Sequence, residues 1–417
     1  MSMFLVGLIF QQGIAVQAAH GDPDYSFGFF GVKTDHVFNK VMYPAAIAQQ
    51  ADCKLLVAGR MIGEGYPFDL LMLRRYNANG SVDTGFGLSG FAVYGGDEYI
   101  SGKANSVTVQ KDGKIVVAGG YYSFGSNDIK PAVFRFTATG YSDTSFGTPD
   151  PVFGYQGRAS FGEGFAGQAD NIGIYKDRLL TTIFQLVDSE PKLIRLYASG
   201  ALDMNFGVSG MADIGIGYRT FTINRNGGKI VVGGSVPEVE PTVDTDPALQ
   251  HFNTNGTPDT SHGSDGIAIL NLNRRDCPYW NQYFYISGLD TQSDGKILAA
   301  GVRGTYNSSF TNFLIRVLSD DSLDLGFSGD GFAVACDGGG PPLILRASRT
   351  TTQVLFFTNF FSNPPKYLRR YNANGLQQLA FPVDYFPADF LIQSNDEKPV
   401  TVQTVTLGDI QLRRFLP

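Results

Sequence analysis

Short apolar runs separated by glycine-bearing turns fill the chain. A run of small residues at Ser106–Gln110 leads through Asp112-Gly113 into the apolar run Lys114–Gly119. Asp-Gly between two such runs is a strong short-range signal for a β-hairpin. The landmark recurs at 292–301, with weaker versions at 49–59, 175–181, 224–233, 347–357 and 393–400. Little of the chain has the period of an amphipathic helix, so the pattern predicts strands throughout.

A second landmark follows each hairpin, where an arginine ends another apolar run. Its positions are Arg75, Arg135, Arg195, Arg316, Arg370 and Arg414, with His251 in the same place once. Most of these arms lead into an Asp-x-x-Phe-Gly turn or a variant of it, whose aspartates are Asp24, Asp83, Asp143, Asp203, Asp259 and Asp324. The arms recur at intervals of 60, 60, 56, 65, 54 and 44 residues. Such a long period predicts stacked supersecondary units.

Each unit therefore holds four strands: the two strands of the hairpin, the arginine arm, and a short run after the turn. The chain begins with a turn that lacks its arm (18–28) and ends on an arm that lacks its turn (411–415). An N-terminal strand near Gly31–Asp35 would complete the last unit and leave no free sheet edge. The pattern predicts an all-β fold, a seven-bladed β-propeller of four-stranded blades, with the ring closed by the N-terminal strand joining the C-terminal blade.

The arms and turns resemble those of the delta-60 repeat family, a bacterial group of tandem units of roughly 60 residues, over residues 22–417. The resemblance implies a β-propeller-like fold and carries over no catalytic residues. Four departures stand out: His262 replaces phenylalanine, His251 replaces arginine, Cys53 replaces glycine in the first Asp-Gly turn, and the sixth unit lacks both turn motifs.

Composition supports a single exposed all-β domain over residues 20–417, since glycine supplies 51 of 417 residues and only 17% are charged. The apolar stretch Met3–Phe10, followed by Ala18 and Ala19, predicts a signal peptide over residues 1–19 and a secreted, periplasmic or cell-surface location. The alternative is a degenerate strand at Ile14–Gln17. No other segment is long and apolar enough for a membrane helix.

Net charge and histidine spacing limit the partners. The formal net charge is −7, and no basic cluster extends beyond Arg274-Arg275, which excludes a nucleic-acid binder. The four histidines (His20, His36, His251 and His262) are separated in sequence and match no zinc motif. No metal site or other cofactor is predicted. The turns at 319–324 and 328–331 carry aspartates at short spacing, so calcium is the one ion that we keep as a candidate ligand.

Three cysteines allow one disulfide. Cys277 and Cys336 follow the turns of consecutive units, so a bridge between adjacent blades competes with two buried thiols. Cys53 is then single, and no catalytic partner accompanies it.

The repeated aspartates and arginines favour a structural role. An active site needs one asymmetric set of groups, whereas these pairs recur in almost every unit. An aspartate that takes local hydrogen bonds in a turn, with the arginine pinning that turn, explains the recurrence better.

Candidate binding residues lie in the irregular connections. The Asp-Gly and Phe-Gly turns share one face by strand alternation, so the other connections share the opposite face. Their candidate ligand-binding residues are Asp97, Glu98, Tyr99, Asp170, Arg219, Arg274, Arg275, Tyr279, Trp280, Tyr283, Asp337, Asp384 and Tyr385, with Lys103 and Gln168 nearby. Tyrosine, tryptophan and arginine anchor partners at interfaces. The alternative is that Trp280 and its tyrosines only cap the gap between two blades.

Two functions fit this sequence. The first, which we favour, is a binding or scaffolding module that presents its irregular face to a protein or a polysaccharide. The second is a hydrolase or lyase with acidic groups in a central funnel, which needs a converging carboxylate pair or a metal.

Overall fold

The computed structural model describes residues 22–63, 69–95, 100–123, 128–149, 156–161, 166–185, 191–223, 228–237, 245–270, 272, 283–304, 310–335, 345–347, 354–358, 366–383, 388–394, 396, 398–405 and 408–416. Over these residues every regular element is a β-strand, which confirms the all-β prediction. No helix that could span a membrane occurs in the same residues.

Most strands are grouped in fours along the chain. The strands are β2 (Lys40–Gln49), β3 (Leu55–Gly63), β4 (Leu70–Tyr76) and β5 (Phe91–Tyr94); β6 (Ile100–Val109), β7 (Ile115–Ser123), β8 (Lys130–Phe136) and β9 (Arg158–Ser160); β10 (Gly167–Tyr175), β11 (Arg178–Gln185), β12 (Lys192–Leu196) and β13 (Met211–Asp213); β14 (Gly217–Ile223), β15 (Ile230–Pro237), β16 (Thr245–Phe252) and β17 (Ile267–Ile269); β18 (Tyr283–Thr291), β19 (Ile297–Gly304), β20 (Phe310–Val317) and β21 (Phe332–Ala335); β22 (Leu345–Ala347), β23 (Val354–Thr358), β24 (Lys366–Tyr371) and β25 (Gln377–Val383); and β26 (Asp389–Ile392), β27 (Pro399–Thr404) and β28 (Ile410–Arg414), with β1 (Val32–Asp35).

These groups are antiparallel meanders. Four of them, β2–β5, β6–β9, β10–β13 and β22–β25, form separate four-stranded sheets, and β14–β17 and β18–β21 join into one larger sheet. The link between them is a single parallel bridge from Thr245 to Tyr283. The fifth four-stranded sheet has the order β1-β28-β27-β26, so the N-terminal strand β1 pairs antiparallel with the C-terminal strand β28. The predicted four-stranded units are therefore present, and one of them combines the two ends of the chain.

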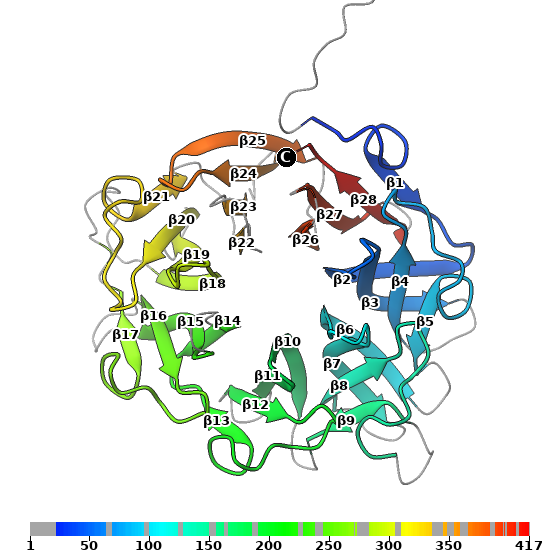
Figure 1. The fold of residues 1–417 in the computed structure, drawn as a ribbon, viewed down its shortest axis with the longest axis horizontal. Coiled ribbons are helices and arrows are strands. Elements are labelled where there is room, and N and C mark those ends of the chain that lie inside the picture. The colour runs from blue at the N-terminus through cyan, green and yellow to red at the C-terminus, as the bar shows by residue number, and fades with distance from the viewer. Residues whose placement is uncertain are drawn as a thin grey trace, which may run out of the picture.

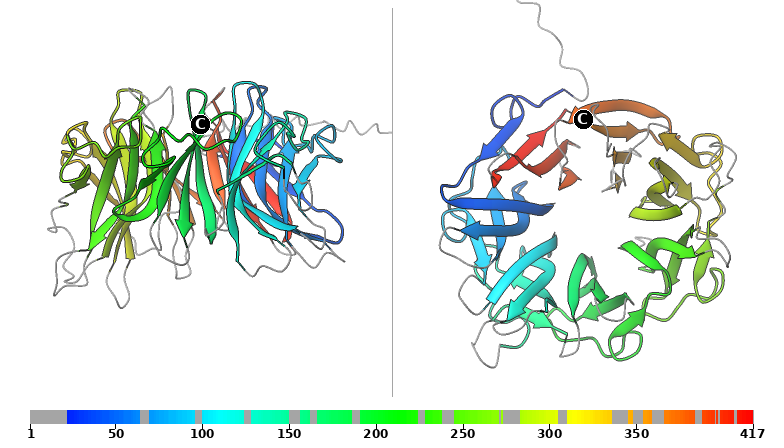
Figure 2. Two further views of the ribbon diagram at one scale, coloured as in Figure 1. Left: turned by 90° about the horizontal axis from the view of Figure 1, so that it is seen from below. Right: turned by 180° about the vertical axis from the view of Figure 1, so that it is seen from behind.

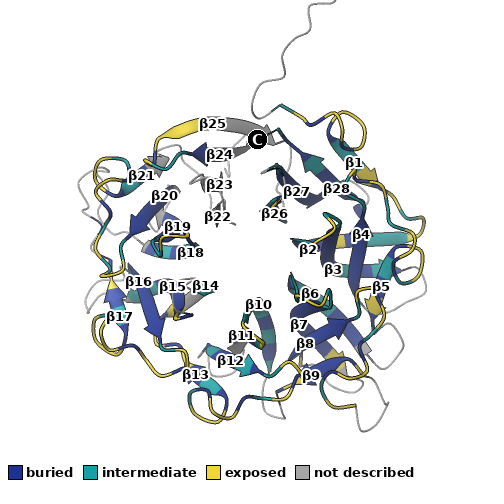
Figure 3. Ribbon diagram, in the orientation of Figure 1, coloured by how far each residue is buried: buried dark blue, intermediate teal, exposed yellow. Residues whose placement is uncertain are grey.

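The sheets follow one another around a central axis, with the first strand of each group nearest to it (Figure 1). The edge-on view in Figure 2 shows the sheets standing side by side. Buried residues concentrate on the middle strands (Figure 3). One core, for example, joins Leu56 and Leu73 of the β2–β5 sheet to Val117 and Phe134 of the β6–β9 sheet. The hydrophobic core thus lies between neighbouring sheets.

The turns explain one departure from the repeat. Gly113 and Gly295 adopt positive φ angles of 83° and 87° in their Asp-Gly turns, and Cys53 adopts a φ of 64° at the equivalent position. A non-glycine residue is strained there, so the replacement costs stability without changing the turn. Cys53 is a free thiol. Cys277, Cys336 and the predicted signal peptide lie outside the described residues.

Candidate functional site

A bulge interrupts five of the strands nearest the axis at corresponding places. In β6, Ala104 pairs with Gly119 and Ser106 with Ala118, which leaves Asn105 as an extra residue. The extra residues in the other four strands are Ala45 in β2, Asp170 and Asn171 in β10, Arg219 in β14, and Ser287 in β18. Bulges re-aim side chains and are over-represented next to active sites. The fold therefore presents a series of unlike residues at matching positions.

Asn105 connects two of these bulges. Its Nδ2 atom donates hydrogen bonds to Oε1 of Gln168 and to the carbonyl oxygen of Ala169, both at 3.0 Å, and lies 3.4 Å from Oδ1 of Asp170. The side chain of one inner strand thereby fixes the bulge of the next. Because the amide bonds to the backbone of Ala169, the bulge that carries Asp170 is held in place before any ligand arrives.

Asp170 has an unusual ionisation. Burial raises its pKa to about 6, although the nearby Lys103 ammonium opposes the shift. Burial also lowers the pKa of Lys103, and Arg60 adds to the effect by repulsion. A carboxyl group that titrates near neutral pH can exchange a proton under physiological conditions, as a general acid or base requires.

Further polar groups extend the set toward the β2–β5 sheet. Arg60 forms an ion pair with Asp69 at 2.6 Å and lies over the ring of Tyr43 at 4.5 Å. Asp69 sits before β4, and its carbonyl oxygen accepts hydrogen bonds from the Gly102 backbone N–H and the Ser101 hydroxyl at the start of β6. We call Tyr43, Arg60, Asp69, Lys103, Asn105, Gln168 and Asp170 the inner polar track. It offers both charges and several amide groups to a polar ligand.

The structure places only part of the sequence-predicted set. Asp170 and Arg219 occupy bulges in successive units, and Tyr283 begins β18. Asp97, Glu98, Tyr99, Arg274, Arg275, Tyr279, Trp280, Asp337, Asp384 and Tyr385 lie outside the described residues. Sequence reasoning named Lys103, Gln168 and Asp170 of the inner polar track and missed Tyr43, Arg60, Asp69 and Asn105. The sequence marks Asn105 only as a polar residue after Ala104. The bulge that sets it apart is visible only from the pairing of Ala104 with Gly119 and of Ser106 with Ala118.

The repeated arginines form the joints between units. Arg75 pairs through Nε with Asp83 of its own unit at 2.9 Å, and its guanidinium lies 4.4 Å from the centre of the Phe86 ring. Its Nη1 atom donates to the carbonyl oxygen of Ala138 in the next unit at 2.7 Å. The same ion pair joins Arg135 to Asp143, Arg195 to Asp203, Arg316 to Asp324, and Arg414 to Asp24. Each arginine thus ties its own turn to the following one.

A cation from the first turn of the unit also reaches each aspartate. Lys54, for example, lies 3.1 Å from Asp83, so the Asp-Gly turn and the Phe-Gly turn share one face as the sequence predicts. Burial opposes ionisation of these aspartates, but hydrogen bonds and nearby cations outweigh it. In Asp143 the contacts with Ser145, Lys114 and Arg135 hold the pKa well below its ordinary value.

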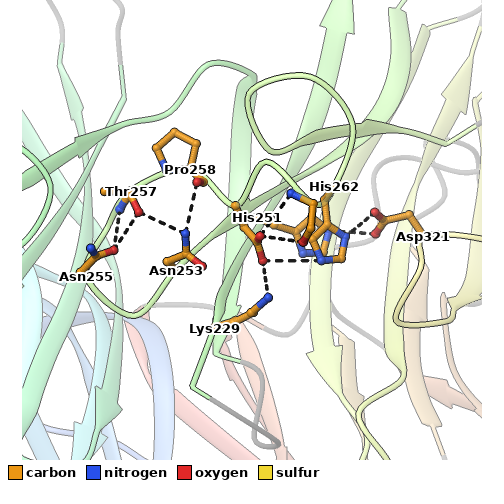
Figure 4. A network of polar contacts seen from close by, with 10 residues as sticks. Lys229, His251, Asn253, Asn255, Thr257, Pro258, His262 and Asp321 are labelled. Carbon is orange, nitrogen blue, oxygen red and sulfur yellow. Dashed lines mark hydrogen bonds and ion pairs between the residues drawn. The ribbon is translucent and has the colours of Figure 1, made fainter.

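Two units depart from this joint. In the sixth, Arg370 is buried and burial lowers its pKa. In the fourth, the side chains of His251 and His262 stack on each other and both reach Asp321 of the next unit (Figure 4). These two histidines, which look unrelated in the sequence, are neighbours in space.

Comparison with known proteins supports the fold. The family described as "Domain of unknown function (DUF5122) beta-propeller" matches residues 50–86, 110–146 and 292–327. No curated protein matches the sequence. Two solved structures are similar: the β-propeller domain of the Trilobed protease from Pyrococcus furiosus (12% identity, 91% of this chain and 94% of that chain, TM-score 0.51) and oligogalacturonate lyase in complex with manganese (10% identity, 91% and 90%, TM-score 0.53). At such identities the likeness concerns the fold alone. The chain is a β-propeller repeat protein.

Proposed function

We propose that the protein is a seven-bladed β-propeller closed by its two chain ends. The meanders β2–β5, β6–β9, β10–β13, β14–β17, β18–β21 and β22–β25 supply six blades, and β26–β28 with β1 supply the seventh. Pairing of β1 with β28 supports the closure. The repeat length and the arginine arms support assignment to the delta-60 group within β-propeller repeats.

We further propose that this propeller is a binding module for a glycan or a protein. The ligand would enter from the irregular face, defined as the face where β3 ends and β4 and β6 begin, and reach the inner polar track. The observation that carries this proposal is the Asn105 amide held between the bulges of β6 and β10 beside Asp170. Such convergent, pre-positioned polar groups are typical of ligand sites.

A glycan suits the inner polar track better than a flat protein surface does. Amide, ammonium and carboxyl groups follow one another on the inner strands β6 and β10, and the neighbouring strand β3 adds the Arg60 guanidinium. Tyr43 of β2 adds an aromatic side chain that is 36% exposed. Sugar hydroxyls both donate and accept hydrogen bonds, so they match such a mixed set. Lys103 and Arg60 would pair with a uronate carboxylate.

One observation favours a second function, hydrolysis or elimination on a bound glycan. Asp170, whose pKa burial raises to about 6, could exchange a proton with the substrate near neutral pH. The second carboxylate of the inner polar track, Asp69, is engaged in an ion pair with Arg60 at 2.6 Å, whereas a paired-carboxylate mechanism needs two carboxyl groups that act on the substrate. Binding without turnover is therefore the primary proposal.

A calorimetric titration tests both functions. The protein is titrated with a uronic acid oligosaccharide, a neutral oligosaccharide of the same length and a set of peptides, and the products are then analysed by chromatography. Saturable binding of a saccharide that weakens in Asp170→Asn, but not in the exposed control Asp213→Asn, supports the site. New chain ends in the products identify the enzyme. Equal binding by Asp170→Asn and the wild type contradicts the assignment of the site.

Location outside the cytoplasm is a proposal that rests on Met3–Phe10 and Ala18-Ala19. A glycan ligand of a cell wall or matrix is consistent with it. N-terminal sequencing of the protein recovered from a periplasmic or culture fraction would test it, and a mature chain starting near Ala19 is expected.

A further inference from the structure

The joint between the fourth and fifth units differs from the regular joints at three positions at once. In the five regular joints an arginine lies over a phenylalanine, and a glycine of the next unit packs on that ring. Here His251 stands for the arginine, His262 for the phenylalanine and Asp321 for the glycine. His251 and His262 have the same sequence separation as Arg75 and Phe86, so the equivalence is position by position.

Asp321 marks the change most clearly. At the ordinary joint Gly140 has a φ of 93°, and a Cβ atom there would lie 2.8 Å from the Phe86 ring. Asp321 adopts a φ of 66° and donates its N–H to Leu318 O, as Gly140 donates to Thr137 O. A side chain at this strained position is tolerated only if it gains something. It directs a carboxylate at the two imidazoles.

The three side chains form a compact donor set. His251 Nε2 lies 2.9 Å from Oδ1 of Asp321, and His262 Nδ1 lies 2.6 Å from Oδ2. The rings stack with centroids 3.8 Å apart and planes 6° from parallel. One donor atom from each residue falls within 4.8 Å of the others. The side chains of His262 and Asp321 are each 12% exposed and that of His251 is 4% exposed, so the set is shielded without being sealed.

A fourth residue supports one of the histidines. Oδ2 of Asp259 lies 3.7 Å from His262 Nε2, the ring nitrogen that faces away from Asp321. Histidines that bind metals usually present their second nitrogen to a carboxylate, which fixes the tautomer and raises the basicity of the ring. Asp259 is itself held by Lys229.

We propose that His251, His262 and Asp321 form a binding site for a divalent cation of the zinc class. Two imidazoles and a carboxylate suit zinc, which takes nitrogen ligands at about 2.0 Å and completes its tetrahedron with water. The guanidinium that occupies the ordinary joint has no lone pair to offer. Binding requires the stacked rings to tilt so that both nitrogens meet one ion, and the protons on those nitrogens move to the outer ring nitrogens or leave.

The position of the site explains what the ion would do. It would replace the arginine clamp between two units that also share the bridge from Thr245 to Tyr283. Thr245 fixes the far end of the same joint, because its hydroxyl donates to Phe284 O at 2.8 Å and accepts from the Phe284 N–H. The ion would therefore hold the two units together at the end of the joint where the turns lie. The bridge from Thr245 to Tyr283 holds them together at the opposite end.

The test is zinc binding by tag-free protein stripped with a chelator. Zinc bound after desalting is measured by mass spectrometry, and the melting temperature is followed against zinc concentration. We expect one tightly held zinc per chain and a melting temperature that rises with zinc. The variant His251→Arg/His262→Phe/Asp321→Gly restores the ordinary joint, so it should fold, bind no zinc at this site and melt independently of zinc.

Control variants address other sources of zinc. His36→Gln changes an exposed histidine, and Asp320→Asn changes an exposed carboxylate beside the site. Both should bind zinc like the wild type. Failure of the wild type to take up zinc would overturn the proposal and leave the three residues as a hydrogen-bonded clamp. Equal zinc binding by the wild type and the triple variant would overturn it as well.

Discussion

Arg414 and Asp24 come from opposite ends of the chain, and Nε of Arg414 lies 2.8 Å from Oδ2 of Asp24. The arginine also donates through Nη1 to Ala78 O of the first complete unit at 2.7 Å. The last unit is thus tied both to the N-terminal turn and to the unit that follows it. The geometry repeats that of Arg75 with Asp83, so the chain ends rebuild the joint found inside the chain.

Replacing Arg414 should destabilise the whole protein. Arg414→Met leaves the buried carboxylate of Asp24 with Lys398 as its remaining ion-pair partner, and breaking a buried pair costs about 3 kcal/mol. The free energy of unfolding, measured by urea denaturation, should fall by roughly this amount. The neighbouring Arg413→Met is the matched control and should cost far less. Equal losses of unfolding free energy in the two variants would contradict a special stabilising role for the Arg414–Asp24 ion pair.

Stability should decline in acid because the turn carboxylates are ionised in the folded state. The pKa values of Asp24, Asp143 and Asp259 are lowered, so each contributes stability above its unfolded pKa of about 4 and loses it as pH falls toward the folded value. We expect the melting temperature to drop between about pH 4 and pH 2. Asp143→Asn should flatten that drop while leaving ligand affinity unchanged.

Asp170 should show the opposite dependence. Its folded pKa is raised, so the folded state binds the proton more tightly, and the ionised form costs stability as pH rises from about 4 through 6. Asp170→Asn should therefore raise stability at pH 7, by at most about 3 kcal/mol, and change it little at pH 4. Asp213→Asn, on an exposed carboxylate, should do neither. Equal stability of Asp170→Asn and the wild type at pH 7 would refute the assignment.

A comparison of alanine substitutions at two glycines distinguishes the cost of backbone strain from the cost of close packing. Gly140 and Gly329 have nearly equal φ angles of 93° and 92°, but a Cβ atom would meet Phe86 and the Gly87 nitrogen only at Gly140. Gly140→Ala should cost about 1–3 kcal/mol more than Gly329→Ala, the usual penalty of overpacking. Comparable unfolding free energies for the two variants would contradict the close packing of glycine on phenylalanine.

Much of the fold was predictable because it rests on local chemistry that recurs. Asp112-Gly113 specifies a hairpin, and the regular return of Arg75, Arg135 and Arg195 exposes the unit. Pairing of the two chain ends followed from counting arms and turns. These features depend on short-range turn geometry and on a period, and both are visible in one sequence.

The inner polar track was harder to predict because strand register decides it. Asn105 reads as an ordinary polar residue in a strand until its neighbours are seen to pair with Gly119 and Ala118. The histidine pair was missed for a related reason. His251 and His262 were recognised as two departures from the repeat, but their stacking became apparent only when the cation and ring of the ordinary joint were seen in contact.

The most direct measurement compares saccharide affinity between the wild type and Asn105→Ala by calorimetry. Asn105 carries no charge and lies away from the arginine joints, so its removal should loosen the Asp170 bulge without unfolding the protein. We predict saturable binding by the wild type and at least about tenfold weaker binding by the variant, which corresponds to about 1.4 kcal/mol. Unchanged affinity in a variant with an unchanged melting temperature would show that the inner polar track is not the binding site.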